Sequence, residues 1–409
     1  MLLRMAPGIR LPDLRTPASA PLYAGFLLTG VVTTLLGPIL PWLTARWLLT
    51  DAQSGYLFTA QFLGSMLGVA LSGTVTRRFG FRAALVFGYA VLAAGVIVLA
   101  VAVWPFALAA TFTYGIGLGI TIPATNLWVS DAAADRRAAA LNVLNLFWGL
   151  GAILCPVFLT TFERAESNSS FLFVLAFTIV TVAVALATTP GVAAAKPPVV
   201  EHSGQTRVNL DSTALFTLGA IFFLYVGTEN AIAGWIASFA QRIGTTDSSG
   251  WLLAPSFFWG ALLAGRALSP VLMKAIPELK LATLGLLFAA LGTLILIAAS
   301  ALPLIFIAAV LAGFGFASVY PIAIAQLSPA FGSSSVRVAP YMFALAGLGG
   351  ATLPSTVGFV STRFQSLRSG LIVPLTTTIV MLLLHIIAQR SAQSHSSNVP
   401  QDYERLHES

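Results

Sequence analysis

The sequence predicts an all-α integral membrane protein, with twelve transmembrane helices in two pseudo-symmetric six-helix bundles. Composition, the spacing of apolar runs and an internal repeat predict this fold. Hydrophobic residues make up 57% of the 409 residues, charged residues make up only 9%, and the mean hydropathy is +0.89. Because a soluble domain carries about 25% charged residues, this chain has too few to cover a water-facing surface. We therefore expect it to lie in a lipid bilayer.

Twelve apolar runs are each long enough to cross a bilayer, which takes about 20 residues. The predicted spans are 22–44, 52–74, 83–102, 105–127, 139–161, 170–188, 212–241, 250–272, 280–300, 302–326, 337–360 and 369–388. A hydrophilic stretch of proline, glycine and polar residues divides them six and six. The predicted parts are a cytoplasmic N-terminal segment (1–21), a first bundle (22–188), a cytoplasmic linker (189–211), a second bundle (212–388) and a disordered cytoplasmic tail (389–409).

The two halves repeat each other without gaps over several spans. At an offset of 198 residues, the matches are Gly115 with Gly313, Gly117 with Gly315, Pro123 with Pro321, Ser130 with Ser328, Gly149 with Gly347, Gly151 with Gly349 and Pro156 with Pro354. Glycine and proline set where membrane helices pack closely or bend. Two six-helix halves of this kind are typical of a transporter whose substrate site lies near the midplane, between the halves.

The basic residues predict the orientation. Most of the 21 lysines and arginines fall near the termini, in the linker and in alternate loops, which predicts that both termini are cytoplasmic. Arg363 and Arg368 run against this pattern. The net charge of +7 then belongs to cytoplasmic loops, so no nucleic-acid partner is expected. We predict a multi-pass protein of the inner (plasma) membrane, whose partners are the lipid bilayer and a small solute and which works as a monomer.

The reactive residue types exclude most enzyme chemistry. The single cysteine, Cys155, excludes a disulfide framework, and the four histidines form no cluster for a metal. No P-loop, hydrolytic triad or zinc motif occurs. We therefore expect no enzyme and no cofactor apart from a coupling ion.

Glu229 is an acid inside the seventh predicted span. An acidic group at membrane depth is costly, so it is a functional-site hypothesis by default. Burial disfavours the charged form, so we expect Glu229 to be protonated unless it is paired, which suits a proton carrier. The alternatives are a structural pair with Arg266 or a hydrogen bond to a neighbouring backbone. Tyr225 lies four residues earlier on the same helical face.

Arg266 is the only base deep in a predicted span, and Trp259 lies seven residues earlier on the same face. A functional arginine here would bind an anion or a carboxylate of the substrate. The alternatives are a pair with Glu229 or a side chain that reaches the cytoplasmic interface.

The other polar groups in the spans are mostly neutral. Amides beside an indole suit a sugar, because amides hydrogen-bond hydroxyls and the indole offers a flat apolar platform. The alternative is ordinary hydrogen bonding between helices. The candidate substrate-binding residues are Gln61, Asn126, Asn142, Asn145, Trp148, Tyr225, Asn230, Trp235, Trp259 and Tyr320.

Two motifs carry a family resemblance. Gly73, Arg78, Gly80 and Arg82 match a signature loop of the major facilitator superfamily, with Arg77 where an acid is usual. The stretch from Tyr225 to Glu229, together with Gly265-Arg266, resembles the fucose/proton symporter branch and related glucose transporters. The resemblance implies alternating access between two six-helix bundles and a gating loop made of Gly73, Arg77, Arg78, Gly80 and Arg82.

These observations predict a secondary active transporter that moves a small neutral polar solute, a sugar or polyol, together with a proton on Glu229. An anion carrier is expected to show more than one buried base. Sodium coupling through the same carboxylate is a second possibility; uniport and the direction of transport stay open. The rival functions are a proton-coupled efflux antiporter for amphipathic compounds, which predicts a large apolar cavity, and a non-transporting receptor on the same fold.

Overall fold

The structure is a computed structural model that describes residues 19–133, 136–164, 168–189, 212–244 and 249–397. Residues 1–18, most of the predicted linker and the end of the predicted tail lie outside these ranges. Helices and short turns make up the described residues, with no strand among them. The first half contains α1 (Ser19–Thr34), α2 (Leu36–Trp47), α3 (Asp51–Val101), α4 (Phe106–Ala132), α5 (Arg137–Arg164) and α6 (Asn168–Thr188).

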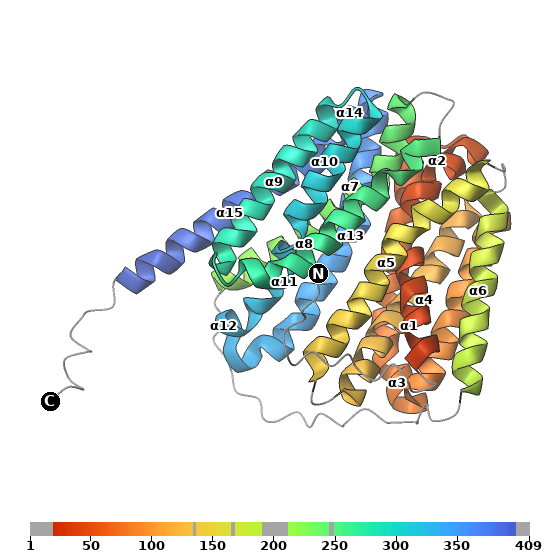
Figure 1. Cartoon of the computed structure of the whole chain (residues 1–409), viewed down its shortest axis with the longest axis horizontal. Helices are drawn as coiled ribbons and strands as arrows, with labels where there is room; N and C mark the ends of the chain where they lie inside the picture. The colour runs from red at the N-terminus through yellow and green to blue at the C-terminus, as the bar shows by residue number, and fades with distance from the viewer. Residues whose placement is uncertain (1–18, 134–135, 165–167, 190–211, 245–248, 398–409) are drawn as a thin grey trace, which may run out of the picture.

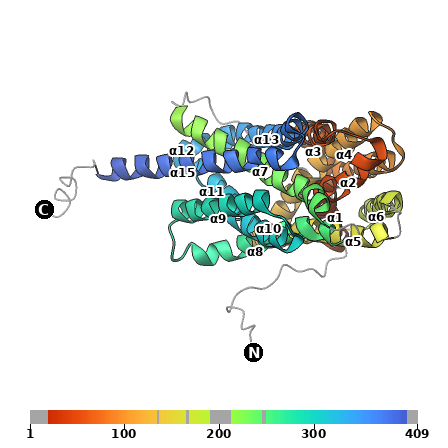
Figure 2. The same ribbon diagram turned by 90° about the horizontal axis from the view of Figure 1, so that it is seen from above.

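The second half lies beside the first (Figures 1 and 2). It contains α7 (Ser212–Ile243), a 3₁₀ turn (Ser249–Leu253), α8 (Ala254–Leu272), α9 (Glu278–Ala298), α10 (Leu302–Phe316), α11 (Val319–Ala325), α12 (Leu327–Phe331), a second 3₁₀ turn (Gly332–Ser334), α13 (Ser335–Phe364), α14 (Leu367–Gly370) and α15 (Ile372–Ser397).

The predicted number of spans is confirmed. Ten helices of the described ranges are long and apolar enough to cross a membrane, and the pair α1 and α2, bent by 46°, makes an eleventh span. The helix α3 supplies two spans, because its 51 residues are interrupted at Gly80. A helix of that length would measure about 76 Å, more than twice the hydrocarbon core of about 30 Å.

The edges of three predicted segments need correction. The loop predicted between the second and third spans is a single residue, because Gly80 turns the chain at φ 83° and ψ 166°, a conformation that glycine adopts without penalty. The tenth span is not continuous to 326 but breaks after α10 and resumes as α11 and α12. The tail predicted as disordered from 389 is helical to Ser397, since the chain has neither glycine nor proline between 375 and 399 to end α15.

The internal repeat appears as equivalent packing in the two halves. A Cβ on Gly151 of α5 would overlap the carbonyl of Leu27 in α1, and a Cβ on Gly349 of α13 would overlap the carbonyl of Phe223 in α7. The first and fifth spans of each half therefore meet backbone to backbone at the same point of the repeat. Such close contacts are the usual role of glycine between membrane helices.

Gly151→Ala should lower the free energy of unfolding by about 1–3 kcal/mol, because a methyl group there must push two helix backbones apart. Thermal unfolding of the purified protein in detergent measures the loss. Gly260→Ala is the matched control, since its nearest neighbour would be the Cδ1 atom of Ile153 at 4.0 Å. Equal melting temperatures for the two variants would contradict the close contact.

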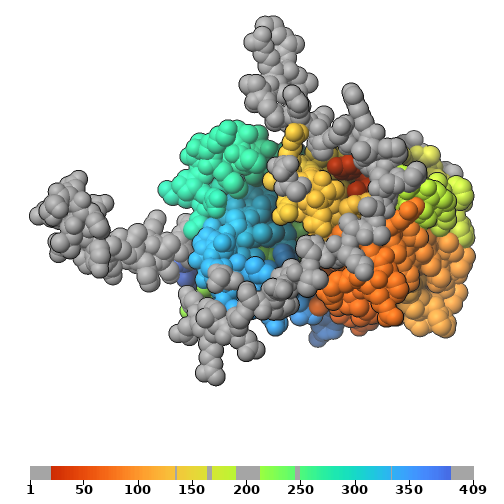
Figure 3. All heavy atoms as spheres, turned by 90° about the horizontal axis from the view of Figure 1, so that it is seen from below, coloured from red at the N-terminus to blue at the C-terminus, as the bar shows by residue number. Residues whose placement is uncertain are grey.

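The halves are joined at one end of the molecule, which we call the closed end. The hydrogen bonds between described residues of opposite halves lie there, involving the start of α3 and α8, the end of α7 and the C-terminal halves of α5 and α13. The closed end is at the top of Figure 1, and Figure 3 shows the opposite face, with the second half in green to blue beside the first half in red to yellow-green.

Candidate functional site

Glu229 is buried in the second half and is paired. Its side chain is 8% exposed, and Arg266 Nη2 lies 3.3 Å from its Oε1 atom. The Tyr225 hydroxyl donates to the same oxygen over 3.2 Å. Tyr225 and Glu229 share one face of α7 because they are four residues apart, and α8 brings Arg266 to that face. The structure thus has the ion pair that the sequence left as one of several alternatives.

Tyr225 connects this ion pair to the break in the tenth span. Its hydroxyl is 3.1 Å from the carbonyl oxygen of Phe316, the last residue of α10, and its ring stacks on Tyr320 of α11 at 5.1 Å. One hydroxyl hydrogen cannot serve the Phe316 carbonyl and Glu229 at once. Tyr225 is fully buried, so in this conformation it offers no surface to a solute, and its predicted role in substrate binding stays a prediction.

The pair is electrically neutral when Glu229 is ionised. Glu229 is the one acid in the interior of a span among the described residues, because the others lie at helix ends: Asp51, Asp131, Glu163 and Glu278. Protonation of Glu229 would therefore leave Arg266 without a protein counter-ion. The sequence analysis expected Glu229 to be protonated unless it is paired, and the structure pairs it with Arg266.

Three predicted residues meet between the halves, next to the closed end. Gln61 of α3, Asn230 of α7 and Trp259 of α8 line one small cavity. Its volume is about 10 Å³, roughly the space that one water molecule needs. Gln61 is already satisfied, since its amide donates to the Thr33 carbonyl and accepts from the Tyr114 hydroxyl.

Trp148 of α5 contacts Trp259 of α8 across the two halves, edge to face at 5.7 Å. Asn145 and Asn142 precede Trp148 on α5 at intervals of three residues, and both are exposed. Asn145 donates its amide to the Leu141 carbonyl one turn back, which leaves the amide oxygen as an acceptor. The sequence predicts these two amides and the indole as contacts of a polyhydroxylated solute, and that role stays a prediction.

Two other predicted amides also donate to a backbone carbonyl one turn back in their own helix. Asn126 of α4 donates to the Ile122 carbonyl at 2.9 Å, and Asn230 donates to the Val226 carbonyl at 2.8 Å. Both are partly exposed, as is Tyr320.

Trp235 lies outside the candidate site, although the sequence placed it there. Its indole N–H donates to the Pro354 carbonyl at 2.8 Å, its ring lies 6.2 Å from the Phe58 ring, and only 1% of the residue is exposed. Trp235 therefore belongs to the contact between the halves.

The predicted gating loop lies at the end of the molecule opposite the closed end, and its described hydrogen bonds and ring contacts are with its own half. Arg82 donates to the carbonyls of Leu186 and Ala187 at the end of α6. The other two basic residues contact neighbours within the loop. The Arg78 guanidinium lies 5.3 Å from the centre of the Phe79 ring, and the Arg77 guanidinium donates to the Thr74 hydroxyl over 3.5 Å. A Cβ on Gly73 would lie 3.6 Å from the Arg77 guanidinium. Gly80 makes the turn described above.

The sequence analysis missed the residues that join the closed end. Arg242 at the end of α7 forms a bidentate salt bridge with Asp51 at the start of α3, with contacts of 2.5 and 2.9 Å. Ser361 of α13 donates to the same carboxylate at 2.5 Å. The one signal in the sequence was an acid and a base at span ends that both face the same predicted side of the membrane.

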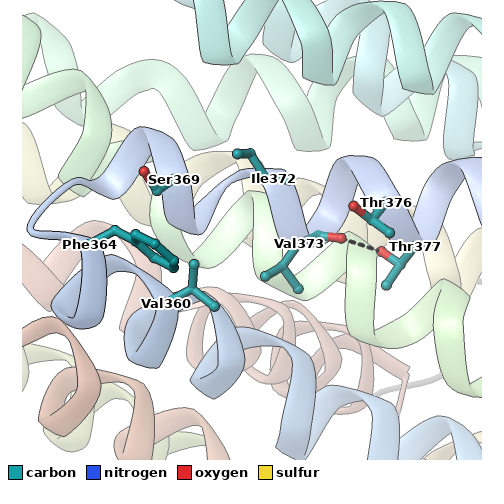
Figure 4. A pocket seen from close by; sticks show the side chains of 7 residues that line it. All are labelled: Val360, Phe364, Ser369, Ile372, Val373, Thr376 and Thr377. Carbon is teal, nitrogen blue, oxygen red and sulfur yellow. Dashed lines mark hydrogen bonds between the residues drawn. The ribbon is translucent and has the colours of Figure 1, made fainter.

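A groove of mostly apolar lining lies away from these residues, between α13 and α15 (Figure 4). It measures about 400 Å³, and its lining is mostly apolar, with Val360 and Phe364 facing Val373 and Ile372. Thr377, also in the lining, donates to the Val373 carbonyl and exchanges a hydrogen bond of 2.7 Å with Thr228 of α7. We do not assign the solute site to this groove, because it lacks the polar groups that gather between the halves.

Two repeated halves of six spans, joined at one end around polar groups, define a membrane transporter with its site between the halves. A family model of the Major Facilitator Superfamily matches residues 22–352. The chain therefore belongs to the major facilitator superfamily, and it is a multi-pass transporter, not an enzyme.

Known relatives agree with this assignment at low identity. A Helicobacter pylori (strain J99) protein described as a glucose/galactose transporter is 24% identical over 383 residues, which cover 87% of this chain and 92% of the relative. The solved fucose:proton symporter of E. coli superposes with a TM-score of 0.58 at 18% identity, covering 90% of this chain and 97% of that one. A D-xylose-proton symporter gives 0.70 at 15% identity, with 89% and 96% covered.

Proposed function

We propose that this protein is a secondary active transporter that moves a sugar or polyol by alternating access, together with a proton carried by Glu229. The observation that carries the proposal is the buried carboxylate of Glu229, held by Tyr225 and Arg266 and next in sequence to Asn230, which lines the small cavity between the halves. A group whose charge depends on access to water is what coupling to a proton requires.

The surroundings of Glu229 favour a proton over sodium. Sodium is a hard cation and needs several oxygen ligands. The nearest charged neighbour of Glu229 is the Arg266 guanidinium, which repels a cation, and its other partner among the described residues is one hydroxyl, that of Tyr225. A proton needs only the carboxylate itself.

A sugar-like solute is supported by the row Asn142, Asn145 and Trp148 on α5 and by the glucose/galactose relative. The efflux hypothesis predicts a large apolar cavity. It has less support, because the cavity between the halves is small and partly lined by amides. The sequence-based expectation of a neutral solute rests on the single base deep in a span, Arg266, because an anion carrier is expected to show more than one.

For the orientation we propose that both termini and the segment 189–211 face the cytoplasm, in the inner membrane of a bacterium. The domain boundaries at 22–188 and 212–388 and a monomeric state are part of the same proposal. In this orientation the closed end faces outwards, so the structure corresponds to an inward-facing conformation.

Purified protein in liposomes tests the proposal. We expect glucose, galactose or a related polyhydroxylated solute to exchange across the membrane in counterflow, and an inward pH gradient to drive its accumulation in the absence of sodium. Transport of ethidium-like cations alone would favour efflux. Accumulation that follows a sodium gradient would overturn the proton, and binding without any transport would favour a receptor.

A further inference from the structure

The charge of the buried pair changes when the proposed proton binds. Glu229 and Arg266 sum to zero while Glu229 is ionised, because the guanidinium is always protonated. Once Glu229 is protonated, the pair carries one positive charge inside the membrane. A buried charge without a partner is strongly unfavourable, whereas the same charge beside an anion is tolerated. A neutral solute would leave this charge uncompensated in the loaded carrier.

Arg266 has hydrogen-bond donors to spare. Only its Nη2 atom has described partners, Glu229 and Tyr225, at 3.3 and 3.4 Å. Its Nε atom is buried and has no hydrogen-bond partner among the described residues. Its side chain is 32% exposed, against 8% for Glu229, so Arg266 is the more accessible member of the pair.

A second unused donor lies on the same face of α8. The indole N–H of Trp259 is buried, lines the small cavity between the halves and has no partner among the described residues. Trp259 precedes Arg266 by seven residues, or about 10 Å along the helix. An indole N–H and a guanidinium can only donate hydrogen bonds. A solute bound to this face of α8 would therefore have to supply the acceptors.

We infer that the solute carries a carboxylate, and that this carboxylate replaces Glu229 as the partner of Arg266 when Glu229 takes up the proton. The class that fits is a small sugar acid, with its hydroxyls on the amides of α5 and its acid group on α8. This inference rests on the proposed function and names its substrate class. Proton and acid then enter together without net charge.

The groups around Glu229 allow this exchange. The titratable or charged side chains that face it are Tyr225 of the same helix, Arg266 of α8 and Tyr320 of α11. Neither tyrosine can neutralise Arg266 while it keeps its hydroxyl proton. On the sides of α13 and α15 the described contact of α7 nearest to Glu229 is the neutral pair Thr228 and Thr377. An incoming anion is thus the available counter-charge.

Matched pairs of solutes test the inference in proteoliposomes. Glucuronate differs from glucose, and galacturonate from galactose, only in an acid group at one end. We expect the acids to be preferred by about 5- to 150-fold in competition at acidic pH, the usual range for two coupled ligands. We also expect uptake of the acids to move no net charge when currents are recorded on a supported membrane.

Variants of Glu229 and Arg266 distinguish a role of Arg266 in solute binding from a purely structural ion pair. Glu229→Gln should bind glucuronate at pH 8 as tightly as the wild type binds it at acidic pH, because the amide mimics the protonated acid. Arg266→Gln should remove the preference for acids, and Arg266→Lys should retain part of it. A purely structural pair predicts instead that both Gln variants lose all solutes equally.

Two results would overturn the inference. One is proton-driven uptake of neutral glucose or galactose with inward positive current and no recognition of the acids, which would leave the proposed function intact. The other is an unchanged ratio of acid to neutral binding in Arg266→Gln. If no solute of either kind responds to the pH gradient, the proposed function falls and this inference falls with it.

Discussion

Glu229→Gln should abolish accumulation of the solute while it leaves exchange intact. The amide keeps the shape of the protonated acid and can still meet the Tyr225 hydroxyl, but it cannot release a proton. A pH difference of one unit supplies about 1.4 kcal/mol and so about tenfold accumulation in a one-proton symporter. In the variant the solute should only equilibrate, so the inside-to-outside ratio should fall from about ten to about one.

Counterflow and pH-driven uptake in the same liposomes measure the two activities side by side. Glu278→Gln is a matched control, since it makes the same change at an exposed acid at the start of α9. That control should accumulate solute like the wild type. If Glu229→Gln also accumulates solute at the wild-type ratio, Glu229 does not carry the proton.

The membrane fold could be predicted from sequence because hydropathy and the repeat report it independently. Twelve apolar runs give the spans, and the glycines at equal offsets give the twofold relation, which Gly151 and Gly349 confirm by the contacts they make. The turn at Gly80 was missed because a single glycine can reverse the chain where a polar loop was expected. Hydropathy has no signal for such a turn.

The candidate site was predicted in its residue types but less well in its contacts. The pair of Glu229 with Arg266 was one of the stated alternatives, since two opposite charges in neighbouring spans seldom stay apart in a membrane. Tyr225 and Trp235 were expected to face the solute because they are aromatic residues with a polar group. The crossing of helices turns both inwards instead, onto Phe316 and Pro354. Such crossing angles are set by packing across the bundle and cannot be read from one helix.

The closed end could not be predicted because it depends on the conformation of the two halves. Asp51 follows Thr50, whose side chain caps α3 together with Gln53, so an acid there has an ordinary local role. Its partner Arg242 is 191 residues away, at the end of α7. Hydropathy and charge counts give no signal for a contact between residues so far apart in the chain.

Cross-linking the closed end should stop transport completely. The hydroxyls of Thr59 in α3 and Ser355 in α13 are in direct hydrogen-bond contact across the halves. Cysteines at these two positions would place their sulfur atoms where the hydroxyls lie, within reach of a disulfide. Because alternating access requires the halves to separate here, the oxidised Thr59→Cys/Ser355→Cys variant should lose solute uptake and regain it with a reductant. The native Cys155, which is buried, is replaced by alanine beforehand.

A second cysteine pair distinguishes locking of the two halves from general damage by the substitutions or the oxidant. Thr228 and Thr377 also share a hydroxyl contact, 2.7 Å long, but both belong to the second half. Oxidised Thr228→Cys/Thr377→Cys should therefore form its disulfide and keep transporting, because the bond joins helices that move together. Mass spectrometry confirms each cross-link before uptake is measured. Transport that survives a complete disulfide between positions 59 and 355 would show that the halves do not part at this end, and alternating access through the closed end would have to be abandoned.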